Sequence, residues 1–350
     1  MGEPSSSSGN SNPFKAFVHI LRDSEPLFVS FTLIAIFFVT FFIFKFCFSS
    51  SKKYEFKGKH VLITGGSKGL GFSIAKQLAL KHESLVTICS RTKDELDQAT
   101  DIIKSTFPLN HSGNIQGIVC DVTKFEEIER LINQSEDQFG RISCLICCAG
   151  QALCGNFLEQ PLDVLQKQID LNYLGSAYPT KVLSKRMVDR KQKDGKICFI
   201  SSQCGLTAFQ GYSAYAPSKF AIRGLAEALR HEFLPFHIGV HIAFLGNIDT
   251  PGFEIEQKVK PAITKRIESF EVLQKPDDVA RAVIHSLQKN EFAIYGGNLS
   301  GYFLGRVSRG LAPYGNNVFV DVLLTPFIVL FAWGHRTFVI DRAHSYFSSG

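Results

Sequence analysis

Short apolar segments alternate with longer amphipathic segments between about residues 56 and 295. The apolar segments have the length of buried strands, and the amphipathic segments have the length of helices. The predicted strands are His60–Thr64, Leu85–Cys89, Ile115–Cys120, Cys144–Cys148, Ile197–Ser201 and Val240–Leu245. Strands that alternate with helices form a parallel sheet that is covered on both faces. We therefore expect one doubly wound α/β domain over 56–295.

Two of the predicted helices begin with a capping-box pattern, in which a Ser or Thr and a Glu three residues later bond reciprocally to backbone N–H groups. One such pattern is Thr92–Glu95, and the other is Thr123–Glu126. We expect these side chains to close the first turns of the two helices.

The N-terminal part of the chain departs from this alternation. Residues 1–26 begin with a Ser-, Asn- and Gly-rich stretch and are expected to form a disordered tail. Leu27–Phe44 is an apolar run of 18 residues without a charge, which is long enough to cross a membrane. We expect an uncleaved transmembrane anchor over 27–48. A cleaved signal peptide is the rival, but its charged leader would be unusually long, and no Ala-x-Ala-like site follows the run.

Positive charges beside the apolar run predict its orientation. Lys15 and Arg22 precede the run, whereas more lysines follow it. These are Lys52, Lys53, Lys57 and Lys59. The excess predicts a catalytic domain that faces the cytosol. Sequons at Asn110, Asn133 and Asn298 would permit the opposite orientation.

Residues 296–350 form a third part of the chain, which is Gly-rich at first and strongly apolar from Val318 to Trp333. Asp321, Pro326 and the short length of the apolar stretch leave two options open. The stretch either spans the membrane or forms a re-entrant or interfacial segment, so we expect a membrane-associated segment.

Charge and cysteine content exclude other classes of function. The net charge is +6 with scattered Lys and Arg, and no basic face predicts nucleic-acid binding. The nine cysteines are irregularly spaced, which argues against a disulfide framework. Cys144 and Cys147 lie three apart in a predicted strand, so they should point to opposite faces and pack as small core residues without a metal. The oligomeric state stays open, a homo-oligomer included.

A glycine-rich turn follows the first predicted strand and opens the next helix. Its sequence runs from Thr64 to Gly71 as TGGSKGLG. Glycines at such a junction let the backbone approach a pyrophosphate, and the helix N-terminus supplies free N–H groups. The turn predicts a Rossmann-type dinucleotide site. Its expected contact residues are Gly65, Ser67, Lys68, Gly69, Leu70 and Gly71.

Residues after the second and third strands indicate which dinucleotide binds. An NAD site places a carboxylate near the end of the second strand, but here Arg91 follows it, and Lys68 projects from the turn nearby. Two cations at this position favour the 2′-phosphate of NADP(H). We expect NADPH as the cofactor, with the carboxylate of Asp121 accepting from the adenine amino group.

Ser202, Tyr215 and Lys219 form the predicted catalytic set. Tyr215 and Lys219 are four residues apart, on one face of a helix, so the lysine can contact the cofactor ribose and lower the pKa of the phenol. Ser202 follows a predicted strand and can donate a hydrogen bond to a substrate oxygen. The spacing carries weight because the chain already has a predicted nucleotide site.

These motifs resemble the classical short-chain dehydrogenase/reductase family over about 56–295. The resemblance implies that Tyr215 donates the proton in ketone reduction, that Lys219 assists it and that Ser202 holds the carbonyl. It also implies that Asn172 holds a water in the proton relay and that Asp121–Val122 contacts the adenine, with Tyr215 and Lys219 close to the cofactor.

Two short segments depart from the family pattern. Cys147-Cys148-Ala149-Gly150 replaces Asn-Asn-Ala-Gly, which removes side-chain hydrogen bonds that brace the sheet. Leu245-Gly246 replaces Pro-Gly beside the nicotinamide pocket. Neither change removes a catalytic group.

Within the family, the segments Tyr212–Tyr215, Ser218–Leu229 and Asp249–Glu254 resemble enzymes that reduce the ketone of a long-chain lipid base at the endoplasmic reticulum in sphingolipid synthesis. A membrane-bound steroid or retinoid dehydrogenase is the first alternative, and a non-catalytic membrane scaffold is the second. We also expect Phe253–Lys275, after the sixth strand, to form a lid over the lipid.

Overall fold

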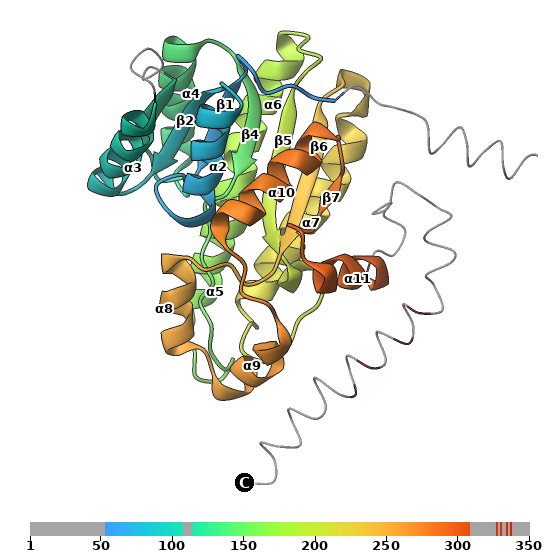
Figure 1. The fold of residues 1–350 in the computed structure, drawn as a ribbon. Coiled ribbons are helices and arrows are strands. Elements are labelled where there is room, and N and C mark those ends of the chain that lie inside the picture. The colour runs from blue at the N-terminus through green and yellow to red at the C-terminus, as the bar shows by residue number, and fades with distance from the viewer. Residues whose placement is uncertain are drawn as a thin grey trace, which may run out of the picture. The chain divides into compact units, whose positions relative to one another are not determined.

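The computed structural model describes residues 53–107 and 114–308, together with four isolated positions further along the chain. The described ranges contain a seven-stranded parallel sheet with the order β3-β2-β1-β4-β5-β6-β7 (Figure 1). Its strands are β1 (His60–Thr64), β2 (Leu85–Ser90), β3 (Ile115–Val119), β4 (Ile142–Cys147), β5 (Lys196–Ser202), β6 (Gly239–Leu245) and β7 (Ala293–Ile294). The predicted doubly wound α/β sheet is confirmed, and β7 is an addition that the sequence did not predict.

Helices cover both faces of the sheet. One face packs against α2 (Gly69–Lys81), α3 (Lys93–Thr106) and α10 (Pro276–Gln288). The other packs against α4 (Phe125–Phe139), α6 (Gly175–Asp189) and α7 (Tyr215–Glu232). The strands are apolar on both sides because each side is buried, as in parallel sheets generally.

Shorter helices gather beyond the carboxyl ends of the strands (Figure 1). They are α5 (Asp163–Gln168), α8 (Pro251–Val259), α9 (Ala262–Ile267) and α11 (Leu299–Val307), with a π-helix at Ile169–Leu174 and single 3₁₀ turns at Gln203–Gly205 and Glu268–Phe270. A further 3₁₀ turn, Leu234–Phe236, lies at the opposite end of the sheet, between α7 and β6. Ligands of such folds bind outside the carboxyl ends of the strands, so these helices shape the candidate site.

Both capping-box predictions were wrong, although the two helices exist. Helix α3 begins after Thr92, but the Thr92 side chain makes no cap, and Glu95 bonds to Lys68 instead. Helix α4 begins one residue later than expected, after Lys124. The Thr123 hydroxyl donates to the Asp121 carboxylate at 2.8 Å, so it is not available to the helix.

The cysteines of β4 pack as the sequence predicted. Cys144 belongs to the core on one face of the sheet, and Cys147 belongs to the core on the other. Burial raises the pKa of both thiols to about 12, so they stay protonated and behave as small apolar residues.

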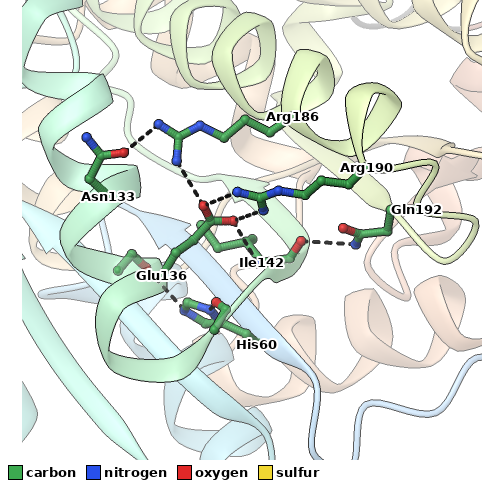
Figure 2. Close-up of polar contacts among 9 residues, drawn as sticks. His60, Asn133, Glu136, Ile142, Arg186, Arg190 and Gln192 are labelled. Carbon is green, nitrogen blue, oxygen red and sulfur yellow. Dashed lines mark hydrogen bonds and ion pairs between the residues drawn. The ribbon is translucent and has the colours of Figure 1, made fainter.

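Glu136 fastens α4 to α6 (Figure 2). Its carboxylate accepts hydrogen bonds from Arg186 at 2.8 Å and from both terminal nitrogens of Arg190. Only 11% of the Glu136 side chain is exposed. Burial acts to raise the pKa of Glu136, but the hydrogen bonds from Arg190 and Arg186 bring it below its ordinary value. The carboxylate is therefore charged and paired at neutral pH.

The predicted membrane segments lie largely outside the described residues. The anchor predicted over 27–48 and the apolar stretch from Val318 to Trp333 both fall there, apart from isolated positions in the second. In the part of the chain that is described, no helix has the length and hydropathy to cross a membrane. Helix α11 is the described part of the C-terminal segment, and its Leu304 packs into the core.

Candidate active site

A cleft of about 540 Å³ lies at the carboxyl ends of the strands. It begins at the turn after β1 and continues past the ends of β4, β5 and β6. Parallel sheets of this kind bind dinucleotides where the strand order reverses, which here is between β1 and β4. The cleft is lined by all predicted cofactor and catalytic residues except Asp121 and Asn172.

The glycine-rich turn can adopt its shape only with glycines at particular positions. Gly65 has a φ of +67°, and a Cβ there would lie 2.7 Å from the Ala149 Cα. A Cβ on Gly71 would lie 2.3 Å from the Gly65 carbonyl oxygen. The turn therefore packs closely against the loop after β4 on one side and against the start of α2 on the other. Its remaining surface faces the cleft.

The N-terminus of α2 faces this cleft without a side-chain cap. Lys68 is the N-cap residue, and its side chain makes no capping hydrogen bond. The first N–H groups of this 13-residue helix are therefore available to an anion. The uncapped helix and the glycine cradle fit the pyrophosphate of a dinucleotide.

The adenosine end of the cleft contains one residue that the sequence analysis assigned elsewhere. Glu95 lines the cleft, and its carboxylate pairs with the Lys68 ammonium at 3.0 Å and lies 3.5 Å from the Ser67 hydroxyl. Arg91 lines the same end. Glu95 could have been identified from its position in the sequence. It lies four residues after Arg91, in the first turn of the helix that follows β2.

The two members of the predicted adenine pair lie differently. Val122 lines the cleft and packs into the core. The Asp121 carboxylate accepts from the backbone N–H of Thr123 at 3.1 Å and from its hydroxyl at 2.8 Å. The adenine contact of Asp121 therefore stays a prediction.

Ser202, Tyr215 and Lys219 converge as the sequence predicted. Ser202 is the last residue of β5, and Tyr215 is the first residue of α7. The side chains of both residues line the cleft. Lys219 follows one helical turn later, with its Nζ 5.6 Å from the centre of the Tyr215 ring.

The pKa of Tyr215 differs in direction from the sequence expectation. Burial raises this pKa well above its ordinary value, and the negative charge of Glu256 adds to the effect. The neighbouring Ser202 hydroxyl acts in the opposite direction. Lys219 donates to the Ile200 carbonyl oxygen at 3.0 Å, and burial lowers its own pKa to about 8. Burial thus favours the protonated form of the phenol.

Asn172 lies within the π-helix Ile169–Leu174 and is fully buried. Its side chain accepts from the Gln151 N–H at 3.0 Å, and it donates to the Gln151 carbonyl oxygen at 3.1 Å and to the Ser218 hydroxyl at 2.9 Å. These bonds tie the loop after β4 to the catalytic helix. π-Helical turns occur frequently at functional sites. The water contact implied for Asn172 stays a prediction.

Thr64 replaces part of the bracing that the Cys147-Cys148 departure removes. Its hydroxyl accepts from the backbone N–H groups of Cys148 and Ala149, each at 3.1 Å. The loop after β4 is therefore held from β1 rather than by its own side chains.

A second polar group adjoins Tyr215 on the substrate side. The Tyr212 ring lies 5.6 Å from the Tyr215 ring, and the Tyr212 hydroxyl lies 2.6 Å from carboxylate oxygens of both Glu256 and Glu268. The buried Lys260 ammonium pairs with both carboxylates. This group was not predictable from the sequence. Its members lie in the loop before α7, on α8 and its C-cap, and in the turn after α9, and they meet only in the fold.

Fold and cleft together define a nicotinamide-dependent oxidoreductase that acts on a ketone or alcohol. Residues 59–260 match the short chain dehydrogenase family. The chain belongs to this family.

Relatives and solved structures agree with this assignment. The chain is 37% identical over 285 residues to 3-dehydrosphinganine reductase of Danio rerio, which covers 80% of this chain and 84% of the relative. It is 36% identical over 266 residues to 3-ketodihydrosphingosine reductase of Mus musculus, covering 75% and 78%. The solved structure of ElxO with NADP bound is 29% identical, with a TM-score of 0.59, and covers 69% of this chain and 99% of that one.

Proposed function

We propose that this chain uses NADPH to reduce the ketone of 3-ketodihydrosphingosine to the alcohol of dihydrosphingosine, a step of sphingolipid synthesis. The observation that carries this proposal is a cleft in which Ser202 and Tyr215 lie between a dinucleotide cradle and a wall with apolar side chains. Relatives with this activity in their names, 34–37% identical to the chain, support the choice of substrate.

The residues of the cleft have distinct parts in this reaction. A bound nicotinamide supplies a hydride to the carbonyl carbon. Ser202 donates a hydrogen bond to the carbonyl oxygen, and Tyr215 transfers its proton to that oxygen as the alcohol forms. The raised pKa of Tyr215 keeps the proton in place at neutral pH until then. Lys219, when charged, stabilises the phenolate that remains and holds the cofactor ribose.

The choice of NADPH over NADH rests on the adenosine end of the cleft. Lys68 and Arg91 both line it, and no acidic residue stands directly after β2, where an NAD site has its carboxylate. Guanidinium and ammonium groups bind phosphate oxygens through charge-assisted hydrogen bonds. The NADP-bound relative ElxO supports the same choice.

The opposite part of the cleft suits an alkyl chain. Apolar side chains line it from α8, α9, α11 and the loop before α7. They are Phe209, Phe253, Ile255, Ile267 and Leu304. A long-chain ketone would bury its tail against this wall while its carbonyl reaches Tyr215.

We further propose that the chain is anchored in the endoplasmic reticulum membrane with the catalytic domain in the cytosol. The 18-residue apolar run Leu27–Phe44 and the lysines after it support this proposal. Protease added to sealed microsomes should digest the domain. Protection until detergent is added, or a glycan on Asn298, would place the domain in the lumen.

The activity is tested with purified full-length protein in detergent. NADPH oxidation is followed with 3-ketodihydrosphingosine, with a steroid ketone and with retinaldehyde. The proposal predicts that kcat/KM is highest for 3-ketodihydrosphingosine. A higher kcat/KM for the steroid or the retinoid would identify the chain as a dehydrogenase of that class. No turnover of any carbonyl substrate would favour a non-catalytic membrane scaffold.

A further inference from the structure

The carboxylates of Glu256 and Glu268 are held close together on the substrate side of Tyr215. Their side chains are only 13% and 10% exposed. Both lie within 2.6 Å of the Tyr212 hydroxyl, which has a single proton to donate. Burial, followed by the two carboxylate charges, raises the pKa of Tyr212, so the phenol remains neutral.

One lysine serves both carboxylates. The Lys260 side chain is fully buried and pairs with Glu256 and Glu268. Two negative charges therefore face one positive charge, and the group keeps a net charge of −1. A mostly buried charge without a counter-charge is costly, so the arrangement favours a cationic ligand.

A separate observation on the same cleft indicates a polar ligand. Gln203 directly follows Ser202, lines the cleft and is only 8% exposed. Within the described ranges its Nε2 has no hydrogen-bond partner. This amide approaches Gly246, another lining residue, where an added Cβ would lie 2.8 Å from Nε2. A buried amide donor without a partner requires an acceptor, such as a ligand hydroxyl oxygen.

The chemistry of the proposed substrate matches both observations. In 3-ketodihydrosphingosine the carbon beside the ketone carries a primary amine and a hydroxymethyl group. The amine can be protonated to an ammonium, and two neighbouring carboxylates would favour this charged form. The ketone must reach Ser202 and Tyr215, so the ammonium and the hydroxyl must lie a few bonds from these residues.

We propose that Glu256 and Glu268 bind the ammonium group of the substrate and that Gln203 binds the neighbouring hydroxyl, so that the cleft selects an amino ketone. This inference rests on the proposed function. Tyr212 and Lys260 act as positioning residues, because they hold the two carboxylates in place beside Tyr215. The ammonium neutralises the excess negative charge of the group when it binds.

The test compares two substrates in each variant: 3-ketodihydrosphingosine and the same long-chain ketone without the amine. The variants are Glu256→Gln and Glu268→Gln, with Glu254→Gln as the control. Glu254 lies on the same helix α8 but is exposed and does not line the cleft. Fluorescence titration with NADPH checks that each variant retains its cofactor site.

We expect Glu268→Gln and Glu256→Gln to lower kcat/KM for the amino ketone by about tenfold or more, since a partly buried charge pair is lost. Activity on the ketone without an amine should change less than about threefold in the same variants. Glu254→Gln should change neither. Gln203→Met should lower kcat/KM for the amino ketone more than kcat/KM for an analogue that lacks the hydroxyl.

Equal losses on both ketones with NADPH binding intact would overturn the inference, because the carboxylates would then only brace α8. A wild-type enzyme that reduces both ketones equally well would overturn it as well. A wild-type enzyme that reduces neither would instead refute the proposed function. The two failures are thereby distinguishable.

Discussion

The Lys219 ammonium lies 5.6 Å from the centre of the Tyr215 ring and donates a hydrogen bond to the Ile200 carbonyl oxygen. It reaches that position because Tyr215 and Lys219 are one turn apart on α7, next to the end of β5. The lysine is buried at the wall of the cleft, and its charge is therefore sensitive to pH.

The pH dependence of ketone reduction should report on Lys219. Burial lowers its pKa to about 8, so the ammonium is charged below this pH and neutral above it. Since the pKa of Tyr215 lies well above its ordinary value, kcat for reduction should fall as the pH rises through about 8 because of the lysine. Stopped-flow rates between pH 6 and 10, roughly the range around that value, measure this limb.

Variants of Lys219 supply the control for that profile. Lys219→Ala should remove the descending limb and weaken NADPH binding through lost ribose contacts. Lys219→Arg keeps a charge of different geometry and should rescue little. If the Lys219→Ala enzyme has an unchanged pH profile, the fall in kcat at high pH must come from another group.

Arg91→Asp should change cofactor preference. The guanidinium is exposed beside the Gly-rich turn, and replacement by a carboxylate removes a phosphate ligand and adds a repelling charge. The ratio of kcat/KM with NADPH to that with NADH should fall by about tenfold or more. Lys193→Asp, an equal change of charge on an exposed loop outside the cleft, is the control. An unchanged ratio would rule out the role of Arg91.

Glu136→Gln should destabilise the domain. The variant loses charge-assisted hydrogen bonds from Arg186 and Arg190, which are worth about 2 kcal/mol. A loss of this size lowers Tm by about 4–8 °C in a domain of this length. Differential scanning fluorimetry of the full-length protein measures the shift. An unchanged Tm would mean that the contacts of Glu136 with Arg186 and Arg190 contribute no net stability.

The contribution of Glu136 should also depend on pH. Its pKa is lower in the folded state than in the unfolded chain, so the stabilisation is complete above the unfolded value of about 4.3. It disappears as the pH falls through the folded value. The difference in Tm between wild type and Glu136→Gln should therefore be constant near neutral pH and shrink below about pH 4.

The lid predicted over Phe253–Lys275 is best tested at an apolar residue that lines the cleft. Ile263 is buried against Phe209, so a polar substitution there would disturb packing. Ile255 lines the cleft and is 52% exposed. Ile255→Ser should raise KM for long-chain substrate more than for a short soluble ketone. Equal effects on both substrates would remove the lid idea.

Sequence patterns were sufficient for features that depend on local spacing. The first six strands, the glycine-rich turn and the four-residue step from Tyr215 to Lys219 all follow from periodicity or helical geometry. Strand β7 did not, because its two residues, Ala293–Ile294, carry no period and are defined by pairing with β6.

Features that depend on distant parts of the chain were not predictable. Tyr212 meets Glu256 and Glu268 across 44 and 56 residues, and only the fold brings them together. Glu95 has the spacing of a capping residue, yet its carboxylate turns to Lys68, 27 residues earlier. The raised pKa of Tyr215 was likewise not predicted, because it follows from burial of the ring in the fold.

The central claim is that Tyr215 supplies the proton in NADPH-dependent reduction of 3-ketodihydrosphingosine. Its most direct test is the single-turnover rate of purified wild-type and Tyr215→Phe enzymes with this ketone, measured alongside NADPH affinity. We expect the rate to fall by about 10²-fold or more with NADPH affinity nearly unchanged, because the substitution removes only the acidic proton. A Tyr215→Phe enzyme that reduces the ketone at a near wild-type rate would contradict the account.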